Sequence, residues 1–104
     1  MIDKKIISKN ITIIEQMTQN GASPSLDDYF DEIVDILSRN IDETMDYLDN
    51  CKKQELEWIS PYFEDMAYNF QSKDFIMFLE ELEKKHQDID MKIDIESARD
   101  SIIN

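Results

Sequence analysis

The side chains of this chain that could take part in metal binding are few and poorly matched to one another. The sequence has one histidine, His86, and Glu83 precedes it by three residues. This is the spacing by which helical di-iron sites supply their ligands, but such sites need a second motif of the same kind. The acidic stretches also lack the glycine that lets a calcium-binding EF-hand loop turn. We therefore expect no bound metal.

Catalysis by a nucleophile or a bound nucleotide is equally poorly supported. The lone cysteine, Cys51, would need a base, and no spacing in the sequence places it beside His86. Phosphate-binding loops need several glycines, whereas this chain has one glycine in 104 residues. We predict that the protein is not an enzyme, that it has no catalytic residues and no cofactor, and that Cys51 is a buried or half-buried residue at a helix end.

The main functional signal is negative charge. The chain has 24 acidic and 11 basic residues, a formal net charge of −13 at pH 7. Between residues 26 and 50 nine acids accompany a single base, Arg39. Two sets of aspartates within this segment recur at helical spacing, so each set projects from one side of its helix. The first set is Asp27, Asp31 and Asp35, and the second is Asp42, Asp46 and Asp49.

This concentration of charge has two interpretations. Acid-rich helix faces keep soluble proteins from associating. They also attract basic partners, because complementary potential speeds encounter and fixes orientation. Like charges one helical turn apart destabilise a helix by roughly 0.2 to 0.5 kcal/mol per pair, and a small domain has little stability to spare, which favours the second interpretation. The lack of a basic stripe argues against direct binding of DNA or RNA.

Both sets of aspartates are therefore predicted to contact a basic partner. Tyr47 lies between Asp46 and Asp49, and we expect it to be the aromatic anchor of this surface. The other large aromatic side chains at helical spacing, Trp58, Phe63 and Phe70, are expected in the core.

Apolar spacing assigns these residues to helices, and no segment before residue 90 shows the alternation of a strand. Gly21 and the run Ser23-Pro24-Ser25 separate the first two helices, and Asp27 and Asp28 fall in the first turn of the second. The predicted helices span about 3–20, 27–40, 42–51, 54–70, 72–85 and 94–103.

Three local features refine this outline. At Pro61 either the fourth helix kinks or a new helix begins with Ser60 as its cap and Pro61 at its first position, and a continuous or slightly kinked helix is favoured. Ser72 is the expected N-cap of the fifth helix. The alternation of Ile89, Met91 and Ile93 predicts a short extended linker, after which Asp94 caps the last helix.

The predicted fold class is all-α, with one compact domain over residues 1–104. It would contain five to six antiparallel helices, packed as a bundle or as a short stack of helical hairpins. A lone cysteine excludes an internal disulfide, which favours a reducing compartment. No signal peptide and no run of ~18 to 20 apolar residues is found, so we expect a soluble cytoplasmic protein that does not contact a membrane.

The second half of the sequence resembles small helical immunity proteins encoded beside bacterial polymorphic toxins, including contact-dependent growth inhibition systems. The resemblance covers roughly the C-terminal 60 residues, and its most particular part is the segment LEWIS at 56–60. The stretches that carry it are 47–60 (YLDNCKKQELEWIS), 63–68 (FEDMAY), 70–75 (FQSKDF) and 91–96 (MKIDIE).

This resemblance implies a stoichiometric inhibitor that binds a cognate toxin domain in the cytoplasm. Such toxins are commonly nucleases, and an RNase is favoured here over a DNase. The acidic helices would then cover the basic active-site cleft of the toxin, and the inhibitor would be a monomer or a weak homodimer. No catalytic residue is carried over from the family.

Two alternatives remain open from the residues alone. The first is a nucleic-acid mimic that uses the same aspartates to inhibit another DNA-binding protein, although its carboxylates would have to cover a long surface. The second is a helical adaptor that binds a peptide in an apolar groove lined by Trp58, Phe75 and Phe78. In that case the acids would serve solubility only.

Overall fold

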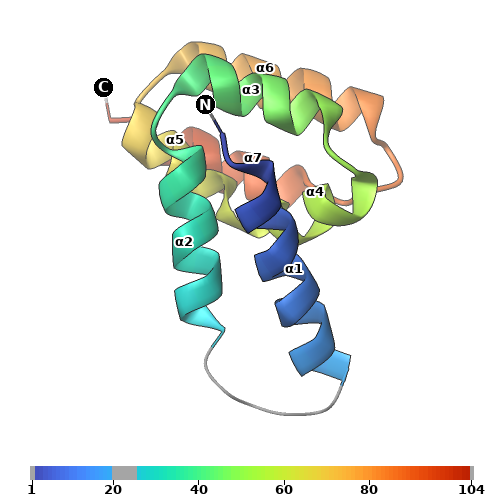
Figure 1. The fold of residues 1–104 in the computed structure, drawn as a ribbon. Helices are drawn as coiled ribbons and strands as arrows, with labels where there is room; N and C mark the ends of the chain where they lie inside the picture. Colours follow the sequence, from blue (N-terminus) through green and yellow to red (C-terminus); the bar gives the residue numbers. More distant parts are fainter. Residues whose placement is uncertain (1, 20–25, 104) are drawn as a thin grey trace.

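A computed structural model describes residues 2–19 and 26–103 of the chain (Figure 1). Most of these residues are helical, as their apolar spacing predicts. Within these residues there are seven α-helices and one 3-10 turn, η1, and no strand. The all-α fold class is confirmed. The elements are α1 (Lys4–Gln19), α2 (Asp27–Leu37), α3 (Ile41–Asn50), α4 (Lys53–Ile59), η1 (Ser60–Tyr62), α5 (Phe63–Phe70), α6 (Lys73–Lys85) and α7 (Lys92–Asp100).

Side-chain caps begin two of the helices. Asp3 starts α1, because its Oδ1 accepts hydrogen bonds from the backbone N–H groups of Lys5 and Ile6 at 3.1 and 3.2 Å. Asn40 starts α3 in the same way, accepting from the N–H of Glu43 at 3.0 Å. The expected breaks at Gly21 and at 23–25 lie outside the described residues, but the placement of Asp27 and Asp28 in the first turn of α2 is confirmed.

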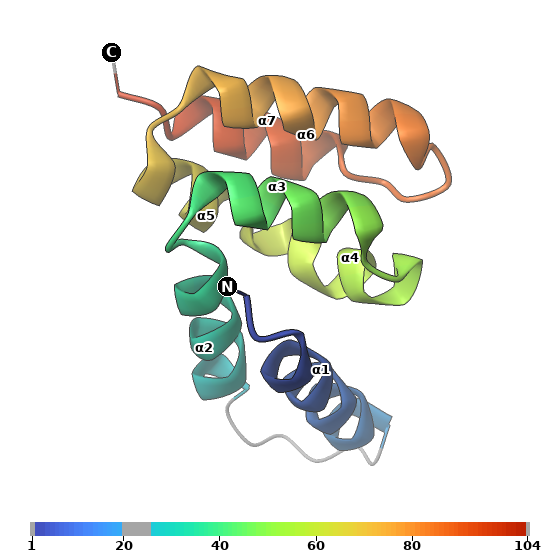
Figure 2. The ribbon, with the colours of Figure 1, turned by 45° about the horizontal axis from the view of Figure 1, so that its top comes forward.

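A buried hydroxyl fixes the sharp turn between the two acid-rich helices. Thr44 on α3 is fully buried, and its hydroxyl donates a 2.7 Å hydrogen bond to the carbonyl of Leu37, the last residue of α2. This bond satisfies a carbonyl at the helix end that has no partner within the helix. As a result α3 lies across α2 instead of running back along it (Figures 1 and 2).

The helix continues through Pro61, as the favoured interpretation predicts. Residues 53–70 are helical without a break, but Ser60–Tyr62 form a tighter 3-10 turn that contains Pro61. Proline lacks the N–H that an α-helix interior needs for its hydrogen bonds, so a tighter 3-10 turn replaces the α-helical turn at this point. Counting α4, η1 and α5 as one bent helix, the described chain has six helical segments, within the predicted range.

The C-terminal hairpin departs from the sequence prediction in three places. Ser72 is the N-cap residue of α6, but its side chain makes no capping hydrogen bond. Ile89 and Met91 are buried as the alternation predicts, but α7 already begins at Lys92 and turns Ile93 outward, leaving it 71% exposed. Asp94 is not a cap: it lies in the first turn of α7 and hydrogen-bonds Ser60 of the 3-10 turn.

The helices pack around one core. The α1–α2 pair is antiparallel and packs on α4 and α5, while α7 lies between α5 and α6 and runs opposite to α6 (Figures 1 and 2). The α3 helix lies beside α6 and runs in the same direction. The molecule measures 41 × 28 × 24 Å along its principal axes. Its largest fully buried side chains are Phe63, Phe75, Ile7, Ile14, Ile33, Leu37, Leu48, Leu56, Ile59, Met66, Leu79 and Leu82.

Two of the three aromatic residues predicted for the core lie only at its margin. Phe63 is fully buried, but Trp58 and Phe70 are partly exposed and pack against the core from outside. The Nε1 of Trp58 donates a 3.0 Å hydrogen bond to Glu15, which ties α4 to α1. No helix in the described part of the chain combines the length and the apolar character that crossing a membrane requires.

Candidate partner-binding surface

All six aspartates predicted to contact a partner are exposed on their helices. The two sets stand on helices that run in different directions, because α3 lies across α2 (Figure 2). The exposed carboxylates leave the apolar side of each helix free to face the core. The sequence therefore places the acids on the surface correctly, and it is their local partners that distinguish the two sets. The six are Asp27, Asp31, Asp35, Asp42, Asp46 and Asp49.

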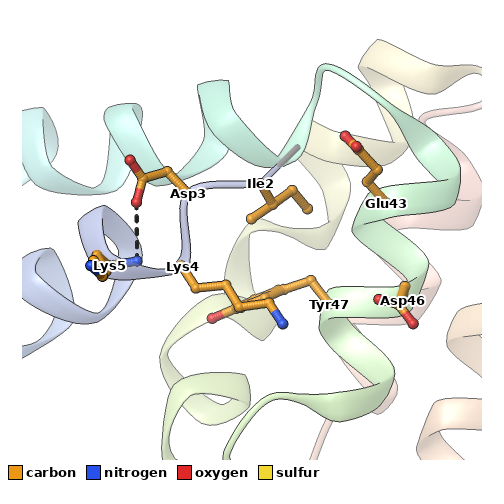
Figure 3. Close-up of a pocket in the computed structure, with 7 residues that line it drawn as sticks. All are labelled: Ile2, Asp3, Lys4, Lys5, Glu43, Asp46 and Tyr47. Carbon is orange, nitrogen blue, oxygen red and sulfur yellow. Dashed lines mark hydrogen bonds between the residues drawn. The ribbon is translucent and has the colours of Figure 1, made fainter.

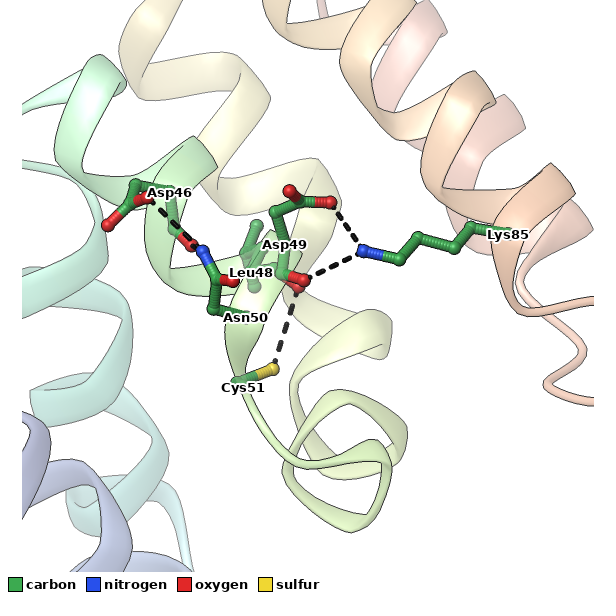
Figure 4. Close-up of polar contacts among 6 residues, drawn as sticks. All are labelled: Asp46, Leu48, Asp49, Asn50, Cys51 and Lys85. Carbon is green, nitrogen blue, oxygen red and sulfur yellow. Dashed lines mark hydrogen bonds and ion pairs between the residues drawn. The ribbon is translucent and has the colours of Figure 1, made fainter.

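The aspartates at the end of α3 are held by contacts within the fold. Lys85, from the last turn of α6, reaches the carboxylate of Asp49 at 2.8 Å and its backbone carbonyl at 3.0 Å (Figure 4). Asp46 accepts a hydrogen bond from the side chain of Asn50 at 3.2 Å. Part of the charge on this helix is thus neutralised by α6, which lowers its contribution to the outward potential.

One aspartate of α2 also forms an ion pair, but a local one. Arg39 pairs with Asp35 at 2.5 Å, one helical turn away. Both side chains of this pair are about two-thirds exposed, so it is a surface ion pair of small energetic weight. No lysine or arginine in the described chain forms an ion pair with Asp31. The ion pair of α2 thus stays within about one helical turn, whereas that of α3 connects α3 to α6.

Tyr47 is not an exposed anchor, contrary to the sequence prediction. Its side chain is only 3% exposed, and its hydroxyl donates a 3.4 Å hydrogen bond to Glu55 of α4. The reason is helical geometry: Tyr47 lies three positions, about one helical turn, after the buried Thr44, and its hydroxyl meets Glu55 of α4 rather than Asp46 or Asp49. Burial and the charge of Glu55 raise the pKa of Tyr47 well above its usual value.

An open pocket of about 670 Å³ lies beside Tyr47, between the beginning of α1 and the side of α3 (Figure 3). Lys4 and Lys5 bring positive charge to it from α1, while Glu43 and Asp46 bring negative charge from α3. Mixed charge of this kind selects neither an anion nor a cation. The pocket is lined by Ile2, Asp3, Lys4, Lys5, Glu43, Asp46 and Tyr47.

Cys51 occupies the helix-end position predicted for it. It is half-buried at the end of α3, and its Sγ lies 3.7 Å from the carbonyl oxygen of Leu48 (Figure 4). Burial and the nearby charge of Glu55 raise the pKa of the Cys51 thiol to about 11, so it is protonated at neutral pH. In the described ranges no three His, Cys, Asp or Glu side chains group closely enough to hold a metal ion.

The apolar groove predicted for a peptide ligand does not form as expected. Phe75 is fully buried, with its ring 5.2 Å from that of Phe70 and 6.5 Å from that of Phe78. A residue without exposed surface cannot line an open groove. Trp58 contacts a different aromatic residue, Phe30 of α2, with ring centroids 6.4 Å apart.

A second tyrosine, which sequence reasoning missed, does stand at the acidic surface. Tyr62 of the 3-10 turn is partly exposed, and its ring stacks on Phe30 of α2 with centroids 4.6 Å apart. Burial and the charges of Asp27, Asp65 and Asp31 raise its pKa. The sequence signal was present in part, because Asp65 follows Tyr62 by one helical turn, but nothing in it joined Tyr62 to α2.

Neither a protein-family model, a curated protein nor a solved structure matches this chain.

Proposed function

We propose that this protein is an immunity protein, which binds a basic bacterial toxin domain and neutralises it by covering its active-site cleft. The observation that carries the proposal is that all six aspartates of α2 and α3 are exposed, in a segment of the sequence with a single basic residue. The resemblance of the second half of the chain to immunity proteins of polymorphic toxin systems supports the same role.

The physical basis of the proposed inhibition is charge complementarity. A nuclease cleft must be electropositive because it holds phosphate groups, and an acidic helical surface occupies such a cleft as a polyanion would. Exposed carboxylates mainly raise the rate of encounter, whereas a few desolvated ion pairs and aromatic contacts slow dissociation. We propose that the toxin is a nuclease that acts in the cytoplasm, an RNase in preference to a DNase, and that its inhibitor works as a monomer or a weak homodimer.

Growth protection tests this proposal directly. The product of the adjacent upstream gene is expressed with and without this protein, and complex formation is measured by pull-down at low and raised salt. The proposal predicts that the wild-type chain restores growth and that raised salt weakens the complex. If the neighbouring gene product neither inhibits growth nor binds this chain, the immunity role is contradicted.

Two triple variants with the same net charge separate the acidic surface from charge in general. Asp31→Lys/Asp35→Lys/Asp46→Lys places the changes on α2 and α3. The control variant, Glu81→Lys/Glu96→Lys/Asp100→Lys, makes the same change of charge at exposed positions of α6 and α7. Loss of protection in the first variant alone is the expected result. Equal loss in both would show that the location of the acids is immaterial.

A further inference from the structure

An aromatic stack reaches the surface between α2 and the bent helix α4–η1–α5. The rings of Phe30 and Tyr62 are 4.6 Å apart and inclined by only 22°, and Trp58 lies 6.4 Å from Phe30. Phe30 is buried, whereas Tyr62 and Trp58 are partly exposed. Two amphipathic rings are thus held at the surface on a packed support, and little further conformational entropy is lost when a ligand contacts them.

Carboxylates border this stack from two helices. Asp27 lies three positions before Phe30 and so on the same side of α2, and Asp31 follows Phe30 directly. Asp65 follows Tyr62 by one helical turn. Burial and the charges of Asp27, Asp65 and Asp31 raise the pKa of the Tyr62 phenol. All three carboxylates are exposed. These residues form a patch, the Tyr62 patch, made of Asp27, Phe30, Asp31, Trp58, Tyr62 and Asp65.

We propose that the Tyr62 patch is the part of the acidic surface that anchors the basic partner, and that it takes an arginine side chain of that partner. The inference deepens the proposed function and depends on it. It keeps the aspartates of α2 in the contact and moves the aromatic anchor from Tyr47 on α3 to the junction of α2 with α5. The guanidinium group would stack on the exposed part of the Tyr62 ring and pair with Asp31 or Asp65.

Arginine fits this arrangement better than lysine. Its planar guanidinium stacks on aromatic rings and donates paired hydrogen bonds to a carboxylate, whereas a lysine ammonium acts as a compact, strongly hydrated charge. Within the described ranges no basic side chain pairs with Asp31 or Asp65, so a cation from outside meets no internal competitor there. A second copy of this chain does not fit, because each copy carries a net charge of −13.

The Tyr62 hydroxyl provides a further polar contact. Among the described residues, no side chain accepts a hydrogen bond from the Tyr62 hydroxyl. The Tyr47 hydroxyl, in contrast, donates a hydrogen bond to Glu55. An aromatic ring that combines apolar area with an unused hydroxyl, bordered by charged residues, has the composition of an interface hot spot.

The test uses the full-length chain and two short peptides, Ac-Arg-Gly-Arg-Gly-Arg-NH2 and its lysine analogue, at about 0.15 M salt. Backbone amide shifts are followed by two-dimensional NMR during titration. The arginine peptide is expected to shift residues 27–34 and 58–66 most, and to bind more tightly than the lysine peptide. Shifts centred on α3, or equal affinity for the two peptides, would overturn the inference. Binding centred on α3 would leave the proposed function standing.

Variants separate the ring from the charges. Tyr62→Leu removes the stacking ring and is expected to lower the affinity for the arginine peptide by about two- to fivefold. Tyr62→Phe keeps the ring and is expected to retain most of that affinity. Tyr68→Leu is the matched control, because Tyr68 is 58% exposed and stands on α5 outside the patch. Asp65→Asn tests the carboxylate without disturbing the stack. Unchanged affinity in both Tyr62→Leu and Asp65→Asn would refute the anchor role.

Discussion

Two tyrosines lie close to aspartates in this molecule, and they behave in opposite ways. Tyr47 has aspartates one and two positions away in the sequence, yet it is 3% exposed and hydrogen-bonded to Glu55. Tyr62 has one acidic neighbour within two positions, Glu64, yet the charges that raise the pKa of its phenol are those of Asp27, Asp65 and Asp31, after the effect of burial. Helical spacing and contacts between helices, rather than adjacency in the sequence, therefore decide which aromatic residue lies beside the aspartates at the surface.

The two acidic helices differ in the same sense. The end of α3 is bound to α6 through Asp49 and Lys85, and its tyrosine belongs to the core. The beginning of α2 adjoins a partly exposed aromatic ring and a further acid from α5. We therefore assign α3 a larger structural role and the beginning of α2 a larger role in binding.

The largest expected effect is on stability. Tyr47→Ala should lower the free energy of unfolding by about 3 to 5 kcal/mol, because it removes a buried aromatic side chain and leaves a cavity. Tyr62→Ala should cost about 1 to 2 kcal/mol, because part of its ring is already in water. Urea denaturation followed by circular dichroism measures both. Equal losses in the two variants would remove the distinction between the tyrosines.

The next effect is on binding of the cognate basic domain. Asp31→Lys/Asp65→Lys should raise the Kd by about tenfold or more, which is about 1.4 kcal/mol. Asp42→Lys/Asp46→Lys makes the same change of charge on α3 and should raise it less. Titration calorimetry at fixed salt measures both values. A larger effect from the α3 pair would place the main contact there.

A smaller effect concerns the ion pair between α3 and α6. Lys85→Met should lower stability by about 0.2 to 1 kcal/mol, since both partners are half exposed and water screens their attraction. Asp49→Asn combined with Lys85→Met completes a double-mutant cycle. A coupling energy near zero would mean that this contact does not hold α3 to α6.

The smallest effect is a local pH response at Trp58. Hydrogen bonds from Gln54 and Trp58 lower the pKa of Glu15 below its ordinary value of 4.5. The stabilisation from this carboxylate is therefore present above pH 4.5 and is lost as the pH falls through the folded-state pKa. The fluorescence of Trp58, the one tryptophan of the chain, should change in that range. The change should be absent in Glu15→Gln and kept in Glu64→Gln.

Much of the fold could be predicted from local pattern. The presence and order of the helices, the local change at Pro61 and the exposure of the aspartates follow from apolar spacing and from the missing N–H of proline. The role of Asp94 could not, because its partner Ser60 belongs to an element far away in the sequence. The same holds for Lys85 and Asp49, which are 36 residues apart.

The candidate surface was only partly predictable for the same reason. Spacing along one helix identifies which aspartates share a side, but the stacking of Tyr62 on Phe30 depends on how α2 packs against α5. The burial of Tyr47 was not evident from spacing either, because the buried residue one helical turn before it is the polar Thr44, and Leu48 is only one position away.

The most direct test of the central claim is the Kd of the adjacent upstream gene's product for three forms of this protein, measured at low and raised salt. The forms are the wild type, Asp31→Lys/Asp35→Lys/Asp46→Lys and Glu81→Lys/Glu96→Lys/Asp100→Lys. We predict tight, salt-dependent binding by the wild type and the α6–α7 variant, and a loss of at least about tenfold in the α2–α3 variant. Binding that is indifferent to salt, or equal in the two variants, would contradict an acidic partner-binding surface on α2 and α3.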